Sequence, residues 1–136
     1  MLVVLDTNVA VQARAAGHPF HRILRAWLAG DVVIAVSTEI LLEYEEVITE
    51  RAGPGRWQIF ARLVEASDHV RRISPTFRFQ LITADPDDNK FADCAIAAEA
   101  DFIITEDRDF NAMRGSGYKS QPIMPEEFIR LHLSGH

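Results

Sequence analysis

The sequence predicts an α/β protein: a three-layer α/β/α arrangement around a central parallel sheet of four or five strands. Continuous apolar runs, such as residues 2–5, 32–36 and 102–105, lack the polar alternation of half-exposed strands and are typical of strands buried on both faces. Segments with helical periodicity separate these runs, as in a parallel sheet with crossover helices. The chain has 136 residues, so we expect one domain spanning 1–136.

The N-terminal third of the chain predicts two buried strands and two helices. The run LVVL at 2–5 is the first strand, and VVIAV at 32–36 is the second. Between them, residues 19–29 place five apolar side chains on one face of a helix. Ser37 is a typical N-cap for the next helix, which we expect over 38–50.

The middle of the chain predicts two further helices and one weak strand. The breaker AGPG ends the preceding helix, and a new helix follows at 55–68. The segment HVRRIS at 69–74 is a weaker strand, whereas TFRFQLIT at 76–83 is ambiguous between an edge strand and a loop. Residues 86–100 are strongly helical, because small and apolar residues continue through nearly the whole segment.

The C-terminal segment predicts the last strands and a final helix. FIIT at 102–105 is a buried strand, and QPIM at 121–124 is a candidate for a last short one. Pro125 suits the first position of a helix, and Glu126 and Glu127 suit its first turn because the helix dipole favours negative charge there.

The overall composition limits the cellular setting and the class of partner. No apolar run approaches the roughly 20 residues needed to span a bilayer, and the N-terminus lacks the pattern of a secretion signal. The one cysteine, Cys94, is best explained as a core residue in a reducing compartment. We therefore expect a cytoplasmic protein without a membrane partner.

The net charge of −6 taken alone argues against binding to nucleic acid. Two features weaken that objection. The cations are twelve arginines and only two lysines, and the planar guanidinium group suits bidentate contact with phosphate. A local group of acids that holds divalent cations would also make the formal charge negative without repelling a phosphate once the cations are bound.

Acidic residues follow two of the predicted buried strands. Asp6 comes directly after the first strand, and Glu106, Asp107 and Asp109 come after the strand at 102–105. Parallel sheets bind ligands at the carboxyl ends of their strands, so these acids are expected at a functional edge. Asp6 and Asp107 could instead only cap the helices that follow, and both interpretations stay open.

Two predicted helices add acids to the same edge. On the helix at 38–50, Glu43 lies at the border of the apolar stripe, with Glu39 as its rival nearer the strand end. Asp93 is the only charged residue from 91 to 98, and burying a lone carboxylate costs several kcal/mol unless it is paired or bound to a metal. The preceding DPDDNK is a helix-start signature, which leaves a supporting role open for Asp88.

Together these positions predict a four-acid metal site formed by Asp6, Glu43, Asp93 and Asp107. Four carboxylates placed close together repel one another unless a cation neutralises them. Oxygen-only ligands select Mg²⁺ or Mn²⁺ rather than zinc. Such an ion can lower the pKa of a bound water and neutralise the charge of a phosphodiester displacement.

The sequence resembles the PIN domain family, in particular VapC-type toxins of bacterial and archaeal toxin–antitoxin pairs. The stretches that carry the resemblance span nearly the whole chain in order, and they are VVLDTNV, STEILLEYEEV, DPDDNKFADCAIAAEADFIITEDRDF and IMPEEFI. The resemblance maps the family's acid quartet onto Asp6, Glu43, Asp93 and Asp107. Further matching positions that support such a site are Thr7, Asn8 and Thr105. Glu106 is a departure, because small residues are common at its position.

The resemblance implies cleavage of single-stranded RNA that depends on Mg²⁺ or Mn²⁺ and leaves 5′-phosphate and 3′-hydroxyl ends. It also implies a homodimer and a cognate antitoxin protein as a partner. Two alternatives stay open, namely a PIN nuclease that acts in RNA processing and a non-catalytic RNA-binding relative. A phosphatase with an aspartate nucleophile is disfavoured, because Asn8 stands where that chemistry needs a second aspartate as its acid and base.

The helix at 55–68 is the candidate partner surface. Its apolar residues cover roughly 200° of the helical wheel, whereas one core face needs about 100°. The helix is either wedged between two layers, or it presents Trp57 and Phe60 to an antitoxin segment or a second subunit.

Overall fold

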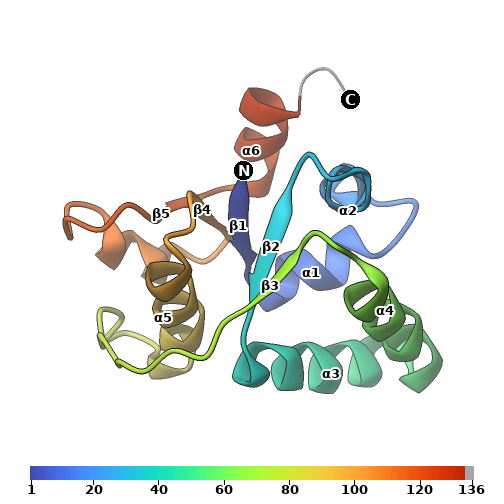
Figure 1. Ribbon diagram of the computed structural model, residues 1–136, viewed down its shortest axis with the longest axis horizontal. Coiled ribbons are helices and arrows are strands. Elements are labelled where there is room, and N and C mark those ends of the chain that lie inside the picture. The colour runs from blue at the N-terminus through green and yellow to red at the C-terminus, as the bar shows by residue number, and fades with distance from the viewer. Residues whose placement is uncertain (134–136) are drawn as a thin grey trace.

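A computed structural model describes residues 1–133, so residues 134–136 of the predicted domain lie outside the described part. Its centre is a five-stranded sheet, all parallel, with the strand order β3-β2-β1-β4-β5 (Figure 1). The strands are β1 (Leu2–Leu5), β2 (Val33–Val36), β3 (Val70–Arg72), β4 (Phe102–Ile104) and β5 (Gln121–Ile123). The predicted fold class is confirmed, and the candidate last strand at 121–124 is present as β5.

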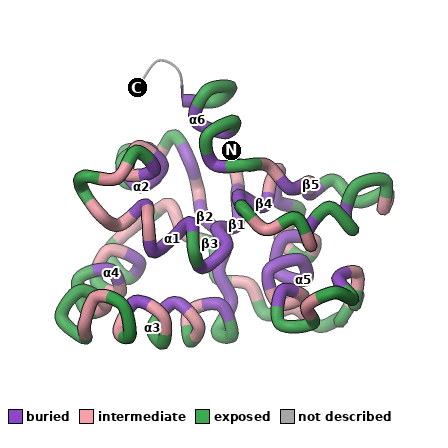
Figure 2. The backbone as a smooth tube through the Cα atoms, turned by 180° about the vertical axis from the view of Figure 1, so that it is seen from behind, coloured by how far each residue is buried: buried purple, intermediate pink, exposed green. Residues whose placement is uncertain are grey.

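The central strands are buried on both faces, as their unbroken apolar runs predict. Val3, Val4, Ile103 and Ile104 are fully buried, and Val4 lies opposite Ile103 in the β1–β4 register. Figure 2 shows the central strands β1, β2 and β4 as mostly buried segments between helices whose outer faces are exposed. The edge strand β5 contains Pro122, which fits an edge because proline has no N–H to donate to a further strand.

Helices cover both faces of the sheet. The helical elements are α1 (Thr7–Ala13), α2 (His21–Ala29), α3 (Thr38–Ala52), α4 (Pro54–Ala66), α5 (Asn89–Ala98) and α6 (Pro125–His132), with short 3₁₀ helices η1 (Pro86–Asp88) and η2 (Arg108–Met113). In Figure 1, α1, α2 and α4 lie on one side of the sheet and α5 on the other. None of the helices within residues 1–133 is long and apolar enough to cross a bilayer.

The strand order reverses between β1 and β4, and this reversal locates the functional edge. The chain moves outward from β1 to β2 and β3, then returns to place β4 and β5 on the other side of β1. Crossovers on the two sides of β1 therefore leave a crevice at the carboxyl ends of β1 and β4. The Asp6 amide donates to the Ile104 carbonyl at 3.0 Å, which joins the two strand ends there.

The apolar stripe predicted for α3 packs against α1 and α4, and the Tyr44 hydroxyl donates to the Leu5 carbonyl at the end of β1. Ile40, Tyr44 and Ile48 are fully buried. Phe60 from α4 lies edge-on to Tyr44, with ring centroids 5.9 Å apart. These contacts fix α3, and with it Glu43, relative to the sheet.

Two local features differ from the sequence prediction, and a third decides between alternatives that the sequence leaves open. Helix α1 was not predicted, because Thr7, Val9 and Val11 are β-branched in a segment of only seven residues. The predicted helix 86–100 begins with a 3₁₀ turn at 86–88 before it becomes α-helical. The ambiguous segment 76–83 is a loop, since α5 side chains bind its backbone in place of a neighbouring strand.

Candidate active site

Asp6 is held at the switch point by hydrogen bonds to both carboxylate oxygens. It is buried, and its Oδ1 accepts from the Thr7 amide at 2.8 Å as the N-cap of α1. Its Oδ2 accepts from the Thr105 hydroxyl at 2.8 Å, so β4 fixes the orientation of an acid that β1 delivers. Capping is thus part of the role of Asp6, but it occupies only one of the two oxygens.

Thr105 continues this chain of hydrogen bonds to the second acid. Its hydroxyl oxygen accepts from the Asp107 amide at 2.9 Å while it donates to Asp6. Asp107 in turn accepts from the Asp109 amide at 2.9 Å through Oδ1 and caps η2. The carboxyl ends of β1 and β4 therefore bring Asp6 and Asp107 to one edge.

Glu43 reaches the same edge from α3. The Thr7 hydroxyl donates to its Oε2, and the Lys90 ammonium lies 2.7 Å from its Oε1. The Glu43 and Lys90 side chains are 25% and 17% exposed, so this ion pair is largely shielded from water. Burial lowers the pKa of Lys90, but the hydrogen bond and the charge of Glu43 outweigh it, and the pKa of Lys90 is raised.

Asp88 is the acid that the structure adds to this group. It is buried at the end of η1, and within residues 1–133 no donor reaches its Oδ2. Burial, the adjoining Asp107 carboxylate and the charge of Asp6 raise the pKa of Asp88 to about 8. One carboxylate oxygen from each of Asp85, Asp88 and Asp109 also lies within 4.8 Å of the others.

Asp93 lies apart from these acids. Its Oδ1 accepts from the Phe79 amide at 3.1 Å. Burial raises its pKa, the Phe79 hydrogen bond and the Arg78 charge oppose that rise, and Glu39 adds to it. Asp93, a member of the predicted quartet, thus binds the backbone of the loop before η1. The acid that lies beside Asp6 and Asp107 is Asp88.

Repulsion among these carboxylates affects the pKa of Asp6. Burial raises the pKa of Asp6, as do the negative charges of Asp107 and Glu43. The hydrogen bonds from Thr105 and Thr7 lower it, without cancelling the rise. A cation at this edge would relieve the repulsion that both Asp6 and Asp88 experience.

The remaining predicted residues lie further from the centre. Asn8 is exposed and its Oδ1 accepts from Arg51 at 3.1 Å, so its side chain is directed along α3. Glu39 pairs with Arg78 at 3.9 Å, and Glu106 is exposed.

The two predicted partner-binding residues differ in their exposure. Phe60 is only 2% exposed and packs between Trp27 and Tyr44, because the core face of α4 turns it inward. A partner cannot reach a ring in that position. Trp57 is partly buried and lines a surface groove between α3 and α4, so it is the member of the pair that a partner can contact.

The donor set fits a hard divalent cation. Carboxylate oxygens converge from separate elements, one of them buried without a donor, and no cysteine or histidine lies among them. Such ligands suit Mg²⁺ or Mn²⁺ rather than a soft metal. The residues that sequence reasoning did not single out are Lys90 and Asp85. The only signal for Lys90 was that it is one of two lysines in the chain.

A family model described as a PIN domain matches residues 2–109, which run from β1 to the start of η2 and include every acid of the candidate site. The chain belongs to the PIN domain family. Among curated protein sequences, none matches this PIN domain.

Solved structures share the same fold. The structure of VapBC2 from Rickettsia felis, bound to a DNA fragment from their promoter, matches with a TM-score of 0.61 and 20% identity over 90% of this chain and 98% of the other. VapC20 from Mycobacterium tuberculosis, a toxin that cleaves the sarcin–ricin loop, matches with a TM-score of 0.58 and 18% identity over 85% and 95%. At these identities the likeness establishes the architecture of the PIN domain and leaves its chemistry to be argued from the site.

Proposed function

We propose that the protein is a metal-dependent endoribonuclease that cleaves single-stranded RNA and acts as the toxin of a toxin–antitoxin pair. The observation that carries the proposal is the set of carboxylates at the β1–β4 switch point. There burial and repulsion raise the pKa of Asp88 to about 8, and one oxygen of Asp88 has no donor within the described chain. Such a site is costly for an apo protein and suits bound cations.

Asp6, Asp88 and Asp107 would hold Mg²⁺ or Mn²⁺, with Asp85 and Asp109 close enough to contribute. When bound, the ion lowers the pKa of a water and neutralises charge on the phosphodiester. Thr105 orients Asp6 through its hydroxyl.

Two residues connect Glu43 to this site. Thr7 and Lys90 orient the Glu43 carboxylate, and the Lys90 ammonium places a positive charge next to the incoming phosphate. We propose a catalytic role for Glu43 and a positioning role for Asp93, because Asp93 binds the loop backbone.

Membership of the PIN family supports phosphodiester cleavage, and the shared fold with VapBC2 and VapC20 supports a toxin role. VapC20 cleaves the sarcin–ricin loop, which supports RNA as the substrate here. The proposed partners are an antitoxin protein and a second copy of this chain, with Trp57 among the contacts.

Incubation of the purified protein with single-stranded RNA tests the proposal. We expect cleavage with Mg²⁺ or Mn²⁺ that EDTA abolishes, and we expect Asp6→Asn and Asp88→Asn to lose it. Asp68→Asn, at an exposed position between α4 and β3, is the matched control and should cut normally. EDTA-resistant cleavage would contradict metal dependence, and normal cleavage by both site variants would contradict the site.

A further inference from the structure

The loop from residue 73 to residue 85, between β3 and η1, is fastened to α5 at two points. Asn89 exchanges two hydrogen bonds with the backbone of Ile82, each 2.9 Å long. One turn further along α5, Asp93 accepts from the Phe79 amide at 3.1 Å. The left-handed Gln80, with a φ of 53°, lies between these anchors. The anchors therefore hold a backbone shape that an unattached loop would rarely adopt.

This fastened loop carries a row of aromatic rings. Phe77 and Phe79 have ring centroids 6.4 Å apart, and Phe79 lies edge-on to Tyr118 at 5.4 Å. We refer to Phe77, Phe79 and Tyr118 as the aromatic row. Within residues 1–133, Phe77 and Tyr118 are the only exposed Phe, Tyr or Trp rings, at 72% and 38%. Exposed aromatic surface gathered in one place is typical of a binding surface.

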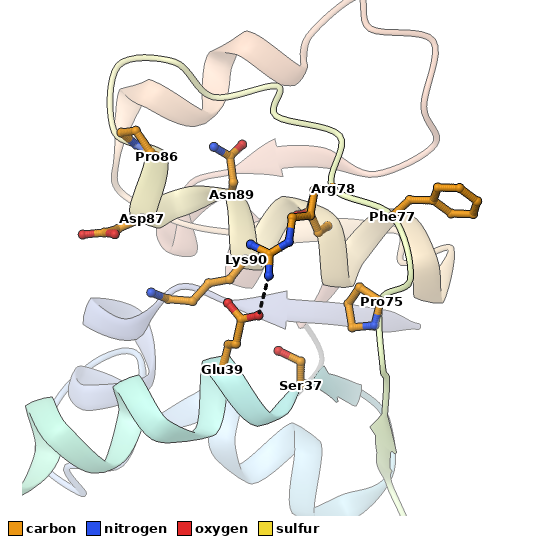
Figure 3. A pocket seen from close by; sticks show the side chains of 10 residues that line it. Ser37, Glu39, Pro75, Phe77, Arg78, Pro86, Asp87, Asn89 and Lys90 are labelled. Atoms are coloured by element: carbon orange, nitrogen blue, oxygen red, sulfur yellow. Dashed lines mark ion pairs between the residues drawn. The ribbon is translucent and has the colours of Figure 1, made fainter.

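Charged side chains of both signs lie beside the row. The cations Arg78 and Lys90 line a pocket of about 200 Å³ together with Phe77 and the acids Glu39, Asp87 and Asp93. In Figure 3, Phe77 points away from this pocket while Arg78 reaches across it to Glu39. The Arg78–Glu39 pair spans 3.9 Å between side chains that are 79% and 63% exposed, so little free energy holds Arg78 there. Its guanidinium group is free to turn to a phosphate.

The pocket adjoins the acid site at Lys90. Lys90 lines the pocket and also contacts Glu43, which accepts from Thr7 beside Asp6. A nucleic-acid strand with its scissile phosphate at the acids would thus have its neighbouring nucleotides over the pocket and the row.

We propose that the aromatic row and Arg78 form a platform for single-stranded RNA, on which an unpaired base stacks on Phe77 while Arg78 contacts its phosphate. The proposal rests on the proposed nuclease function and specifies how that site selects unpaired strands. A base in a duplex has both faces covered by its neighbours and cannot stack on a protein ring. The aromatic rings supply stacking and the arginine supplies charge, the combination that binds single strands in other proteins.

Fluorescence anisotropy with a labelled single-stranded RNA of about 12 nucleotides, in EDTA so that no cleavage occurs, measures the platform directly. We expect Phe77→Ala to raise Kd about 5- to 30-fold, because stacking on one ring accounts for affinity of that size. Arg78→Ala should lower the slope of log Kd against log salt by about 0.7. Phe77→Trp should retain affinity, and its added fluorescence should be quenched by RNA.

Matched variants control for loss of an exposed side chain. Ile59→Ala on α4 removes apolar surface that is 58% exposed, and Arg130→Ala on α6 removes an exposed cation; neither should change Kd more than twofold. Phe77→Ala should also leave the affinity for a duplex of the same sequence unchanged. Equal effects on duplex and single strand, wild-type affinity in Phe77→Ala, or no RNA binding by the wild-type protein would overturn the platform.

The same samples separate this proposal from the proposed function. A wild-type protein that cuts RNA while Phe77→Ala binds and cuts equally well would overturn the platform alone. A protein that binds RNA through Phe77 but cuts none with Mg²⁺ or Mn²⁺ would support the platform and overturn the nuclease.

Discussion

At the scale of single residues, the positions of the acids that end strands could be predicted, as could that of Glu43 on α3, whereas the roles of the acids around the start of α5 could not. Asp6 and Asp107 follow buried apolar runs. The carboxyl ends of parallel strands all lie at the same edge of the sheet, so both acids are expected there. Asp88 and Asp93 are five residues apart, about 140° on an ideal helix, so only one of them can face the switch point. Asp93 was favoured because its neighbours are apolar, whereas Asp88 was hidden in a helix-start signature.

Two substitutions at Asp93 distinguish a loop anchor from a metal ligand. Asp93→Asn keeps a carbonyl oxygen for the Phe79 amide, so we expect RNA cleavage to remain within about threefold of wild type. Asp93→Ala removes the acceptor and should loosen the loop, which limited trypsin digestion after the exposed Arg78 would detect as cleavage several-fold faster.

The opposite results for these two variants would indicate that Asp93 is a metal ligand. A metal ligand changed to asparagine loses its charge, so Asp93→Asn would then lose metal binding and activity, and trypsin cleavage would be unchanged in both variants. Asp87→Asn is the control for the removal of one acid from the same region, because Asp87 is exposed in η1.

At the scale of elements, apolar periodicity predicted most of the helices and strands that pack in the core. It did not predict the loop that is held by polar contacts. The buried stripe of α3 and the strands β1, β2 and β4 were correct because their burial depends on local pattern alone. The loop at 73–85 could not be predicted, since it depends on α5 side chains that come later in the chain. The wide apolar surface of α4 divides between the core, through Phe60 and Val64, and the surface groove at Trp57.

Substitutions on α4 separate these two roles. Phe60→Ala should lower the free energy of unfolding by about 3–5 kcal/mol, because it removes a fully buried ring. Trp57→Glu should leave the protein folded and weaken self-association or antitoxin binding, since a desolvated interface rejects an unpaired charge.

Urea unfolding and size-exclusion chromatography with light scattering measure the two effects on α4. Ile59→Glu on the exposed side of the helix is the control for an added acid. If Trp57→Glu associates as the wild type does, the groove between α3 and α4 is not an interface.

At the scale of the whole molecule, the repulsion among the acids of the site lowers the free energy of unfolding. The strand order brings acids from β1, η1 and β4 together whatever their mutual repulsion, because the packing of the sheet and helices fixes these ends. The class of architecture could be predicted from the sequence, and the free-energy cost of the site could not, since that cost arises only when separate elements meet. The cost should appear as a dependence of stability on pH and on divalent cations.

We expect the metal-free protein to lose stability as pH rises from about 4 to about 8. Asp88 has a pKa of about 8 in the fold, against about 3.9 for an unfolded aspartate, so between these values the folded state binds more protons. The free energy of unfolding then falls with rising pH, and the contribution is fully present below about 4 and lost above about 8. Burial raises the pKa of Asp6 and adds in the same direction. The Leu2 amide lowers the pKa of Asp101, so Asp101 changes the free energy of unfolding only below about pH 4.

Melting curves in EDTA and in Mg²⁺ across this pH range test the expected slope. Asp88→Asn should melt several degrees above wild type in EDTA at pH 7.5, because it relieves the repulsion, and its Tm should depend less on pH. Mg²⁺ should reverse the order: at 100 times its Kd it stabilises the wild-type fold by about 2.7 kcal/mol, and the variant has lost a ligand. Asp68→Asn should follow wild type in every condition. Two results would contradict this prediction. One is a wild-type Tm in EDTA that rises from pH 5 to pH 8, and the other is an Asp88→Asn protein that melts below wild type in EDTA and is still stabilised by Mg²⁺. Either would mean that Asp88 is a structural acid with a partner and that the cation binds elsewhere.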